Sequence, residues 1–272
     1  MASLSESDLS FLAAELTLGC RILAEQEIID AFGHLSLRLP GQPDLYMINR
    51  GMSPSLVRPE DFIVCDLAGL VVDGDGHPNG EWPIHSGIFA ARPDVQCVLH
   101  SHSRMSRIFS LSTQKLRGLL TSSAPEWQGG LPLYRAPGLI TSLEKGRALA
   151  QTLGSHSAAL LRGHGDVVVG ASVRATVLKA ISLKQNADVL HEVLSHSPTI
   201  ELWSDEDLAA WGNPAPASVS DEAIAAKKNK AWDYYAARVD GTLGRLLHKP
   251  YVFDTCPCCG YEPTRRAAIA ED

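Results

Sequence analysis

The sequence predicts an α/β domain in which helices cover a central, mainly antiparallel sheet. Composition is the first observation behind this fold class: 45% of the 272 residues are hydrophobic and 20% are charged, as in soluble globular proteins. The order of hydrophobic patterns is the second, because it runs helix, strands, helix, strand, helix, two strands, helix.

The first half of the chain is predicted to begin with a helix and to continue as strands. Apolar side chains at mostly helical spacing predict an amphipathic helix over 7–26, with Ser5 or Ser7 as its N-cap. Short segments of β-type composition, separated by Gly, Pro and Asp, predict strands at 34–39, 45–48, 62–66 and 70–72. A helical pattern returns within 79–93, and 95–100 is typical of a buried strand.

The second half predicts fewer strands and longer helices. After a variable loop at 112–127, we expect a helix at 143–153 and strands at 158–161 and 167–169. Apolar residues recur close to a helical period from 172 to about 195, which predicts the longest helix.

A Pro- and Gly-containing stretch at 211–220 predicts a linker. It divides the chain into a main domain, 1–210, and a C-terminal segment, 211–272. We expect another helix at 223–247 within that segment, followed by an irregular end.

Charge and hydropathy exclude several classes of partner. The chain carries 24 basic and 31 acidic side chains, a net charge of −7, and no basic cluster, which argues against a nucleic-acid partner. The apolar runs are far shorter than the ~18 residues that a membrane span requires. The first residues are polar and acidic, unlike a signal peptide, so we expect a cytoplasmic protein that does not bind membranes.

The cysteines fall into two groups. Three lie singly within apolar runs and are expected to be core thiols: Cys20, Cys65 and Cys97. Three more crowd together near the end of the chain: Cys256, Cys258 and Cys259. This second group is a candidate metal site, although the second Cys pair of a typical zinc site is missing.

The strongest indication of chemistry is a His-x-His pair at the end of a predicted strand. His100 and His102 project from the same face, because alternate residues of a strand do so, and two imidazoles can then bind one ion. His164, between Gly163 and Gly165, is a candidate third ligand. Three histidines with an open position are typical of a catalytic metal site. The alternative is chance, since such pairs and glycine-flanked histidines also occur without a metal.

Glu81 lies in the turn that precedes the helix at 79–93. Beside a metal its carboxylate is a candidate general acid/base or a displaceable ligand, and otherwise a helix-capping group. His85, one helical turn later, either faces the same pocket or packs against the sheet.

Four segments together resemble the class II aldolase/adducin family: Glu81-x-x-x-His85, Ala91-Arg92-Pro93-Asp94-Val95, Val98-Leu99-His100-Ser101-His102 and Leu161-Arg162-Gly163-His164-Gly165. The resemblance covers roughly residues 8–200. It implies a class II aldolase-like α/β/α fold, with one divalent metal ion per subunit held by the three histidines and Glu81 as the catalytic acid/base. It also implies a homo-oligomer, usually a tetramer, with active sites at subunit interfaces.

The phosphate-binding segments of the sugar-phosphate aldolases are largely rewritten here. In their place stand Gly33-His34-Leu35-Ser36, Arg50-Gly51-Met52-Ser53-Pro54 and Asn79-Gly80-Glu81. These departures favour a small organic acid over a phosphorylated sugar as the substrate.

Three segments resemble the branch of the family that contains aromatic-acid decarboxylases: Asn49 to Pro54, Leu161 to Gly170 and Trp232-Asp233-Tyr234-Tyr235. Arg50 is a candidate carboxylate clamp, because guanidinium pairs with carboxylate bidentately, or else a surface residue of a turn. The other candidate substrate-binding residues are His34, Ser53, His85 and Tyr234.

The function that this resemblance implies is a metal-dependent carbon–carbon lyase that decarboxylates a hydroxylated aromatic or pyridine carboxylate through a metal-stabilised enolate. One alternative is a non-haem iron oxygenase of the type that acts on prenylated hydroxyphenylpyruvate or hydroxymandelate. A second is an aldolase that cleaves a non-phosphorylated hydroxy acid or sugar. Zn, Mn, Co and Fe all remain candidate metals, because the ligand type does not fix the metal. A non-enzymatic scaffold is disfavoured because all three histidines are present.

Overall fold

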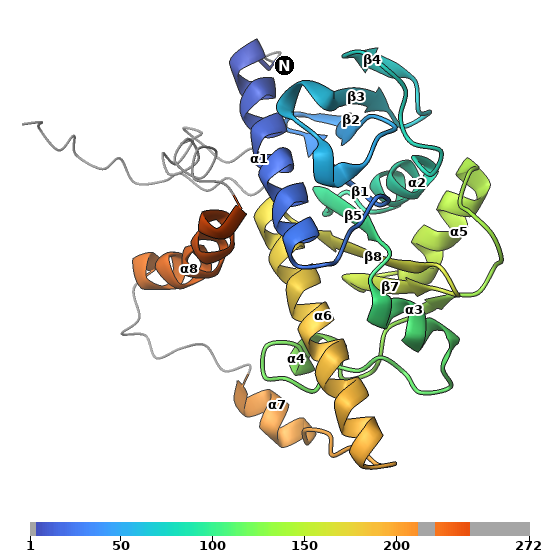
Figure 1. The fold of residues 1–272 in the computed structure, drawn as a ribbon, viewed down its shortest axis with the longest axis vertical. Helices are drawn as coiled ribbons and strands as arrows, with labels where there is room; N and C mark the ends of the chain where they lie inside the picture. Colours follow the sequence, from blue (N-terminus) through green and yellow to red (C-terminus); the bar gives the residue numbers. More distant parts are fainter. Residues whose placement is uncertain (1–3, 212–220, 240–272) are drawn as a thin grey trace, which may run out of the picture.

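A computed structural model describes residues 4–211 and 221–239, which form one eight-stranded sheet between two helical layers (Figure 1). The strands are β1 (His34–Leu39), β2 (Gln42–Asn49), β3 (Phe62–Asp66), β4 (Val71–Asp73), β5 (Cys97–Ser101), β6 (Leu133–Tyr134), β7 (Ala158–Leu161) and β8 (Gly165–Gly170). The helices are α1 (Glu6–Glu25), α2 (Pro83–Ala91), α3 (Arg104–Leu111), α4 (Ala124–Trp127), α5 (Leu143–Leu153), α6 (Val173–His196), α7 (Asp205–Trp211) and α8 (Asp221–Val239). Two short 3-10 turns, η1 (Pro54–Leu56) and η2 (Pro59–Asp61), follow β2.

The strand order in the sheet is β4-β3-β2-β1-β5-β8-β7-β6, and each neighbouring pair is antiparallel except β6 with β7. The central pairs fix the positions that matter for the site. His34 on β1 lies opposite His100 on β5, and Ser101 lies opposite Asp166 on β8. The predicted fold class, a mainly antiparallel sheet covered by helices, is confirmed.

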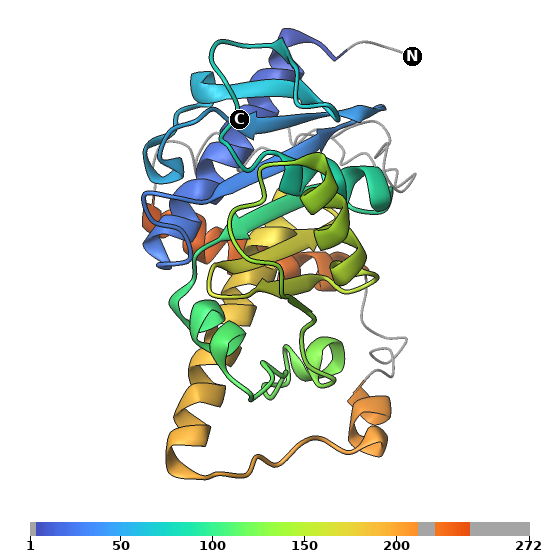
Figure 2. The same ribbon diagram turned by 90° about the vertical axis from the view of Figure 1, so that its right-hand side faces the viewer.

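The two faces of the sheet pack against different helices. Helices α1 and α6 lie side by side on one face, with α8 packed against them, and α2 and α5 cover the other (Figures 1 and 2). Successive residues of β5 alternate between these layers: Cys97 and Leu99 belong to the core under α1 and α6, and Val98 belongs to the core under α2 and α5. His100 and His102 therefore continue along the α2 side.

Helices α2 and α5 cross at very short range. A Cβ atom added at Gly87 of α2 would lie 2.4 Å from the carbonyl carbon of Gly146 on α5. Only glycine permits this approach, which holds α2 and the segment before it firmly on the sheet.

Most of the predicted elements are present. The opening helix has Ser5 as its N-cap, with a capping box formed by Asp8, and α5 matches the range expected for it. Buried Cys20, Cys65 and Cys97 are unpaired core thiols, as expected. None of the helices in the described ranges has the length and apolar character needed to cross a membrane.

The structure also contains elements that hydrophobic patterns did not predict: α3, α4, β6 and α7. Two of them, α4 and β6, have only four and two residues, too few to show a period, and β6 exists through its pairing with β7. All but the first residue of the predicted linker, most of the C-terminal tail and the three clustered cysteines lie outside the described residues. The boundary between 1–210 and 211–272 stays a prediction.

Candidate metal centre

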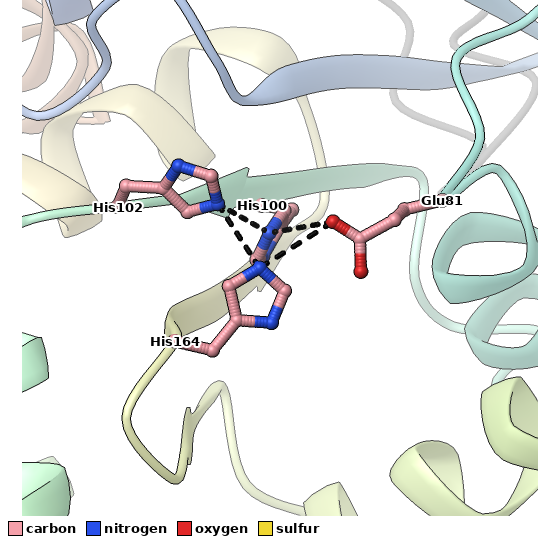
Figure 3. Close-up of side chains that lie close together, drawn as sticks. All are labelled: Glu81, His100, His102 and His164. Carbon is pink, nitrogen blue, oxygen red and sulfur yellow. Dashed lines mark hydrogen bonds and ion pairs between the residues drawn. The ribbon is translucent and has the colours of Figure 1, made fainter. Parts of the chain in front are cut away.

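Three histidines converge at the end of the sheet. The Nε2 atom of His102 lies 3.1 Å from Nε2 of His100 and 3.1 Å from Nε2 of His164 (Figure 3). His100 is the fourth residue of β5, and His102 follows two positions later on the same side of the chain. The alternation expected for a strand thus places both imidazoles against one point, as the sequence predicted.

The third histidine comes from the tight turn between β7 and β8. Gly163 adopts a positive φ of 67°, which lets the chain reverse within three residues. A Cβ atom at Gly165 would lie 2.0 Å from the carbonyl oxygen of Ser101, so this position also requires glycine. The two glycines bring the His164 backbone against the end of β5, which is the close approach that they were expected to permit.

Glu81 faces the three imidazoles from the opposite side (Figure 3). Its Oε2 atom lies 3.4 Å from Nε2 of His164 and 3.7 Å from Nε2 of His100. Its Oε1 atom accepts a hydrogen bond from the Ile140 backbone N–H at 2.8 Å, which fixes the carboxylate. The side chain therefore points into the histidine cluster and makes no hydrogen bond that caps α2, where Trp82 is the N-cap residue without a side-chain bond.

The donor atoms fit one divalent ion. All four lie within 4.8 Å of one another. Ligands at about 2.0 to 2.1 Å from a tetrahedral ion lie about 3.3 Å apart, close to the separations among the imidazole nitrogens. His100 Nδ1 lies 2.8 Å from the backbone carbonyl oxygen of Asp166, to which it donates, leaving Nε2 free to bind a metal.

The protonation states also suit a metal. Burial lowers the pKa of His100 well below its usual value, and it lowers that of His102, so these imidazoles are neutral near pH 7. Burial alone disfavours ionised Glu81, but the hydrogen bonds from His164 and the Ile140 N–H, with the attraction of His100 in its protonated form, outweigh it and lower the pKa of Glu81 to about 2. Neutral imidazoles beside a carboxylate are the forms that bind cations.

A buried carboxyl group supports the cluster from behind. Asp166 accepts a hydrogen bond from the Ser101 hydroxyl at 2.8 Å, and it is only 2% exposed. Burial raises its pKa to about 6, although hydrogen bonds from Ser106 and Ser101 oppose this shift. The bond ties β8 to the end of β5, directly between the two histidine-bearing segments.

A cavity of about 410 Å³ opens beside the cluster. Glu81, His102, His34 and Ser53 line it, together with apolar side chains such as Phe32 and Leu139. The structure thus brings His34 and Ser53, two of the candidate substrate-binding residues, to the same cavity as the histidine cluster.

The other candidates do not line the cavity, although buried His85 contacts His34. The Arg50 guanidinium pairs with Asp61 at 2.6 Å and does not line this cavity. Tyr234 on α8 is 57% exposed and meets the Tyr235 ring edge to face, while Arg238 lies over its ring. Substrate binding by Arg50 or Tyr234 stays a prediction.

Sequence patterns did not single out some cavity residues. Asn79 accepts a hydrogen bond from the Glu81 N–H at 3.1 Å through its side-chain oxygen, so it shapes the turn that presents the carboxylate. Such Asn turns are a local signal that could have identified it. Phe32 and Leu139 carry no such signal, since only the fold brings them to the cavity.

Comparison with known proteins places this chain in a family. The model of the class II aldolase and adducin N-terminal domain matches residues 14–191. The chain belongs to this family. A divalent metal ion is the cofactor of its class II aldolases, in accord with the histidine cluster.

Several curated relatives are decarboxylases. Decarboxylase tropJ of Talaromyces stipitatus is 30% identical over 195 residues, which are 63% of this chain and 72% of tropJ. The 3,4-dihydroxyphthalate decarboxylase of Rhodococcus jostii is 28% identical over 218 residues, 75% of this chain and 89% of the relative. A 4-hydroxy-3-prenylphenylpyruvate oxygenase/4-hydroxy-3-prenylbenzoate synthase of Streptomyces roseochromogenus is 34% identical over 146 residues, 53% of each chain.

Solved structures agree on the fold. An aldolase II superfamily protein from Pseudomonas syringae superposes with a TM-score of 0.73 at 23% identity, over 89% of this chain and 97% of that protein. The class II aldolase-like fold expected from the sequence is therefore confirmed, and the curated relatives support a decarboxylase or aldolase type of lyase activity.

Proposed function

We propose that this protein is a divalent-metal-dependent decarboxylase of a hydroxylated aromatic or pyridine carboxylate. One observation carries the proposal: three imidazole nitrogens and the Glu81 carboxylate converge on one point at the wall of the cavity. Three imidazole nitrogen ligands beside an open cavity are typical of catalytic rather than structural metal sites.

Each residue of the cluster has a distinct part. His100, His102 and His164 hold the metal. When bound, a divalent ion supplies positive charge that stabilises developing negative charge on substrate oxygens. Glu81 is held by the Ile140 N–H within reach of the same point. Because its carboxylate is ionised, it would first accept the proton of a substrate hydroxyl group and then return this proton to the carbon that loses carbon dioxide.

The cavity suits a flat organic acid better than a phosphorylated sugar. The segments in which this chain differs from the sugar-phosphate aldolases contribute Gly33, His34, Ser53, Asn79 and Gly80 to its wall. Apolar side chains complete the lining, and such surfaces bind aromatic rings well. The relatives tropJ and 3,4-dihydroxyphthalate decarboxylase, which are decarboxylases by name, support the same reaction class.

Carbon dioxide release from a panel of hydroxybenzoates, dihydroxyphthalates and hydroxypyridine carboxylates tests the proposal. The purified protein is assayed with and without oxygen, after its metal content has been measured by elemental analysis. We expect anaerobic release that disappears in the His100→Ala/His102→Ala variant. Metal-loaded protein that releases no carbon dioxide from any acid of the panel would contradict the decarboxylase assignment.

The second candidate is a non-haem iron oxygenase. Its support is the relative that is named an oxygenase and is 34% identical over about half of this chain. Imidazole ligands accept iron as readily as zinc. The same assay separates the two, since an oxygenase consumes dioxygen and stops when it is removed.

We also propose that the protein is a cytoplasmic homotetramer, as the family resemblance implies. Phe32 and Leu139, at the cavity, are 67% and 56% exposed in the single chain, and such apolar side chains are suited to burial by a neighbouring subunit. Light scattering of the purified protein measures the assembly directly, and a monomer would contradict the proposal.

A further inference from the structure

A buried chain of polar side chains runs behind the cavity. His34 Nδ1 lies 2.6 Å from His85 Nε2, and His85 Nδ1 lies 2.5 Å from the Ser36 hydroxyl oxygen. His34 is 5% exposed, and both His85 and Ser36 are 0% exposed. We call these three residues the His34–His85–Ser36 chain.

The fold explains why polar groups are buried here. Leu35 and Leu37 of β1 point into the core under α1 and α6, so His34 and Ser36 point to the opposite face, where α2 covers them. His85 on α2 is the residue that meets both. Since His34 Nδ1 is engaged by His85 and the His34 ring lines the cavity, Nε2 is its free ring nitrogen.

Both rings are neutral, because they are buried from solvent and burial disfavours the charged form of an imidazole. Each ring then carries one proton, so the chain has two arrangements. Either both protons are on the Nε2 atoms or both are on the Nδ1 atoms, because the bond between the rings needs one donor and one acceptor.

Ser36 distinguishes the two arrangements. With both protons on Nε2, the Ser36 hydroxyl donates to His85 Nδ1, His85 donates to His34, and every group in the chain is paired. With both protons on Nδ1, His85 donates to Ser36, whose own hydrogen then has no acceptor, since among the described residues its oxygen has His85 as its hydrogen-bond partner. A buried donor without an acceptor is unfavourable, so the first arrangement is preferred.

We propose that the His34–His85–Ser36 chain has a fixed direction, in which His34 presents a neutral Nε2–H donor to the cavity for an oxygen atom of the bound substrate. His34 is the residue that contacts substrate, and His85 and Ser36 are positioning residues. The role toward a carboxylate or phenolic oxygen rests on the proposed function, whereas the direction of the chain does not.

The direction is measurable without turnover. Protein labelled with ¹⁵N in its histidines and loaded with Zn²⁺, which is diamagnetic, reports the protonated nitrogen of each ring by long-range ¹H–¹⁵N correlation at pH 7.5. His34→Gln and His85→Gln assign the two sets of signals. We expect Nε2–H in both rings, and Nδ1–H in both would overturn the proposal.

A pair of variants tests the role of Ser36. Ser36→Ala removes the hydroxyl that makes the two arrangements unequal, so signals of the Nδ1–H form should gain intensity. Ser86→Ala is the matched control: Ser86 is also a buried serine on this face and bonds the Tyr46 hydroxyl at 3.0 Å, outside the chain. Equal spectra for Ser36→Ala and wild type would refute the role of Ser36. The wild-type spectrum tests the direction of the His34–His85–Ser36 chain even if the variant does not fold.

Salicylate, a simple hydroxybenzoate, probes the contact with substrate. Titration into the zinc-loaded protein should shift the His34 Nε2–H signal, and His34→Phe should weaken binding by about 10-fold or more, as expected for a lost hydrogen bond to an anion. Unchanged affinity in His34→Phe would overturn the contact. The decarboxylase assignment and the fixed direction of the chain can fail separately. Nε2–H signals without carbon dioxide release reject only the decarboxylase assignment. Nδ1–H signals with carbon dioxide release reject only the fixed direction.

Discussion

Glu81→Gln tests whether the carboxylate moves a proton. The amide oxygen can still accept the 2.8 Å hydrogen bond from the Ile140 N–H, so the side chain keeps its position. The amide group that replaces Oε2, however, cannot exchange a proton at neutral pH. General acid/base catalysis contributes about 10²- to 10⁴-fold, so we expect kcat to fall by that factor, or about 3 to 5 kcal/mol in the barrier.

Metal binding should survive this substitution. The three imidazoles remain, and Nε2 of His102 still lies 3.1 Å from Nε2 of each of the other two histidines. Elemental analysis should therefore find the wild-type metal content at saturating metal. Activity is measured as carbon dioxide release with the best acid of the panel. Wild-type kcat in the fully loaded Gln variant would refute the proton-transfer role.

Glu81→Asp provides the matched control, because it keeps the charge and changes the reach. The carboxylate withdraws by about 1.5 Å, one carbon–carbon bond, so it cannot both hold the Ile140 N–H and stay 3.4 Å from His164. A misplacement of about 1 Å costs up to about 100-fold in rate. We therefore expect the Asp variant to retain more activity than the Gln variant, and the reverse order would show that side-chain size, not proton transfer, decides the rate.

Three further predictions concern the metal, the buried acid and the helix crossing. His100→Ala/His102→Ala should lose the metal by elemental analysis, since one imidazole and one carboxylate remain. In metal-free protein, the pKa of Asp166 near 6 in the fold exceeds the ~3.9 of an unfolded chain. Its stabilising contribution is therefore complete below pH 4 and is lost as the pH rises through 6, by about 2 to 3 kcal/mol. Asp166→Asn should remove this part of the pH dependence in denaturant unfolding. Gly87→Ala should lower the free energy of unfolding by about 1 to 3 kcal/mol, because its Cβ meets the Gly146 backbone at 2.4 Å.

Each of these measurements has a control. His156→Ala replaces an exposed histidine outside the cluster and should leave the metal content unchanged. Gly129→Ala adds a Cβ with nothing within 4 Å, so its unfolding should match that of the wild type. Metal retained in the double histidine variant, an unchanged pH profile in Asp166→Asn, or equal unfolding of the two glycine variants would each contradict the corresponding prediction.

The residues that we propose as metal ligands could be singled out from the sequence because their signals are local. The two-residue period of a strand places His100 and His102 on one side of β5 whatever surrounds it. Glycines on either side of His164 indicate a tight turn without reference to the rest of the chain. Regular helices and strands were predictable for the same reason, since periodicity is a property of the segment itself.

Other features depended on which segments meet. Leu35 and Leu37 mark one buried face of β1, and the polar residues between them are those that a strand usually exposes. His34 and Ser36 are buried because α2 covers that face and brings His85 to them, a contact between positions about fifty residues apart. The pairing of Arg50 with Asp61 likewise separates this guanidinium from the cavity.

The sequence by itself thus predicted the fold class, and it proposed the three histidines and Glu81 as site residues, because each rests on local spacing or on a family motif. Only the tertiary structure decided that the donor atoms lie within 4.8 Å of one another, which candidate residues line the cavity, and that a buried hydrogen-bonded chain supports it. The physical reason is that spacing along a strand or turn fixes the direction of a side chain, whereas its neighbours are chosen by the packing of elements distant in the chain.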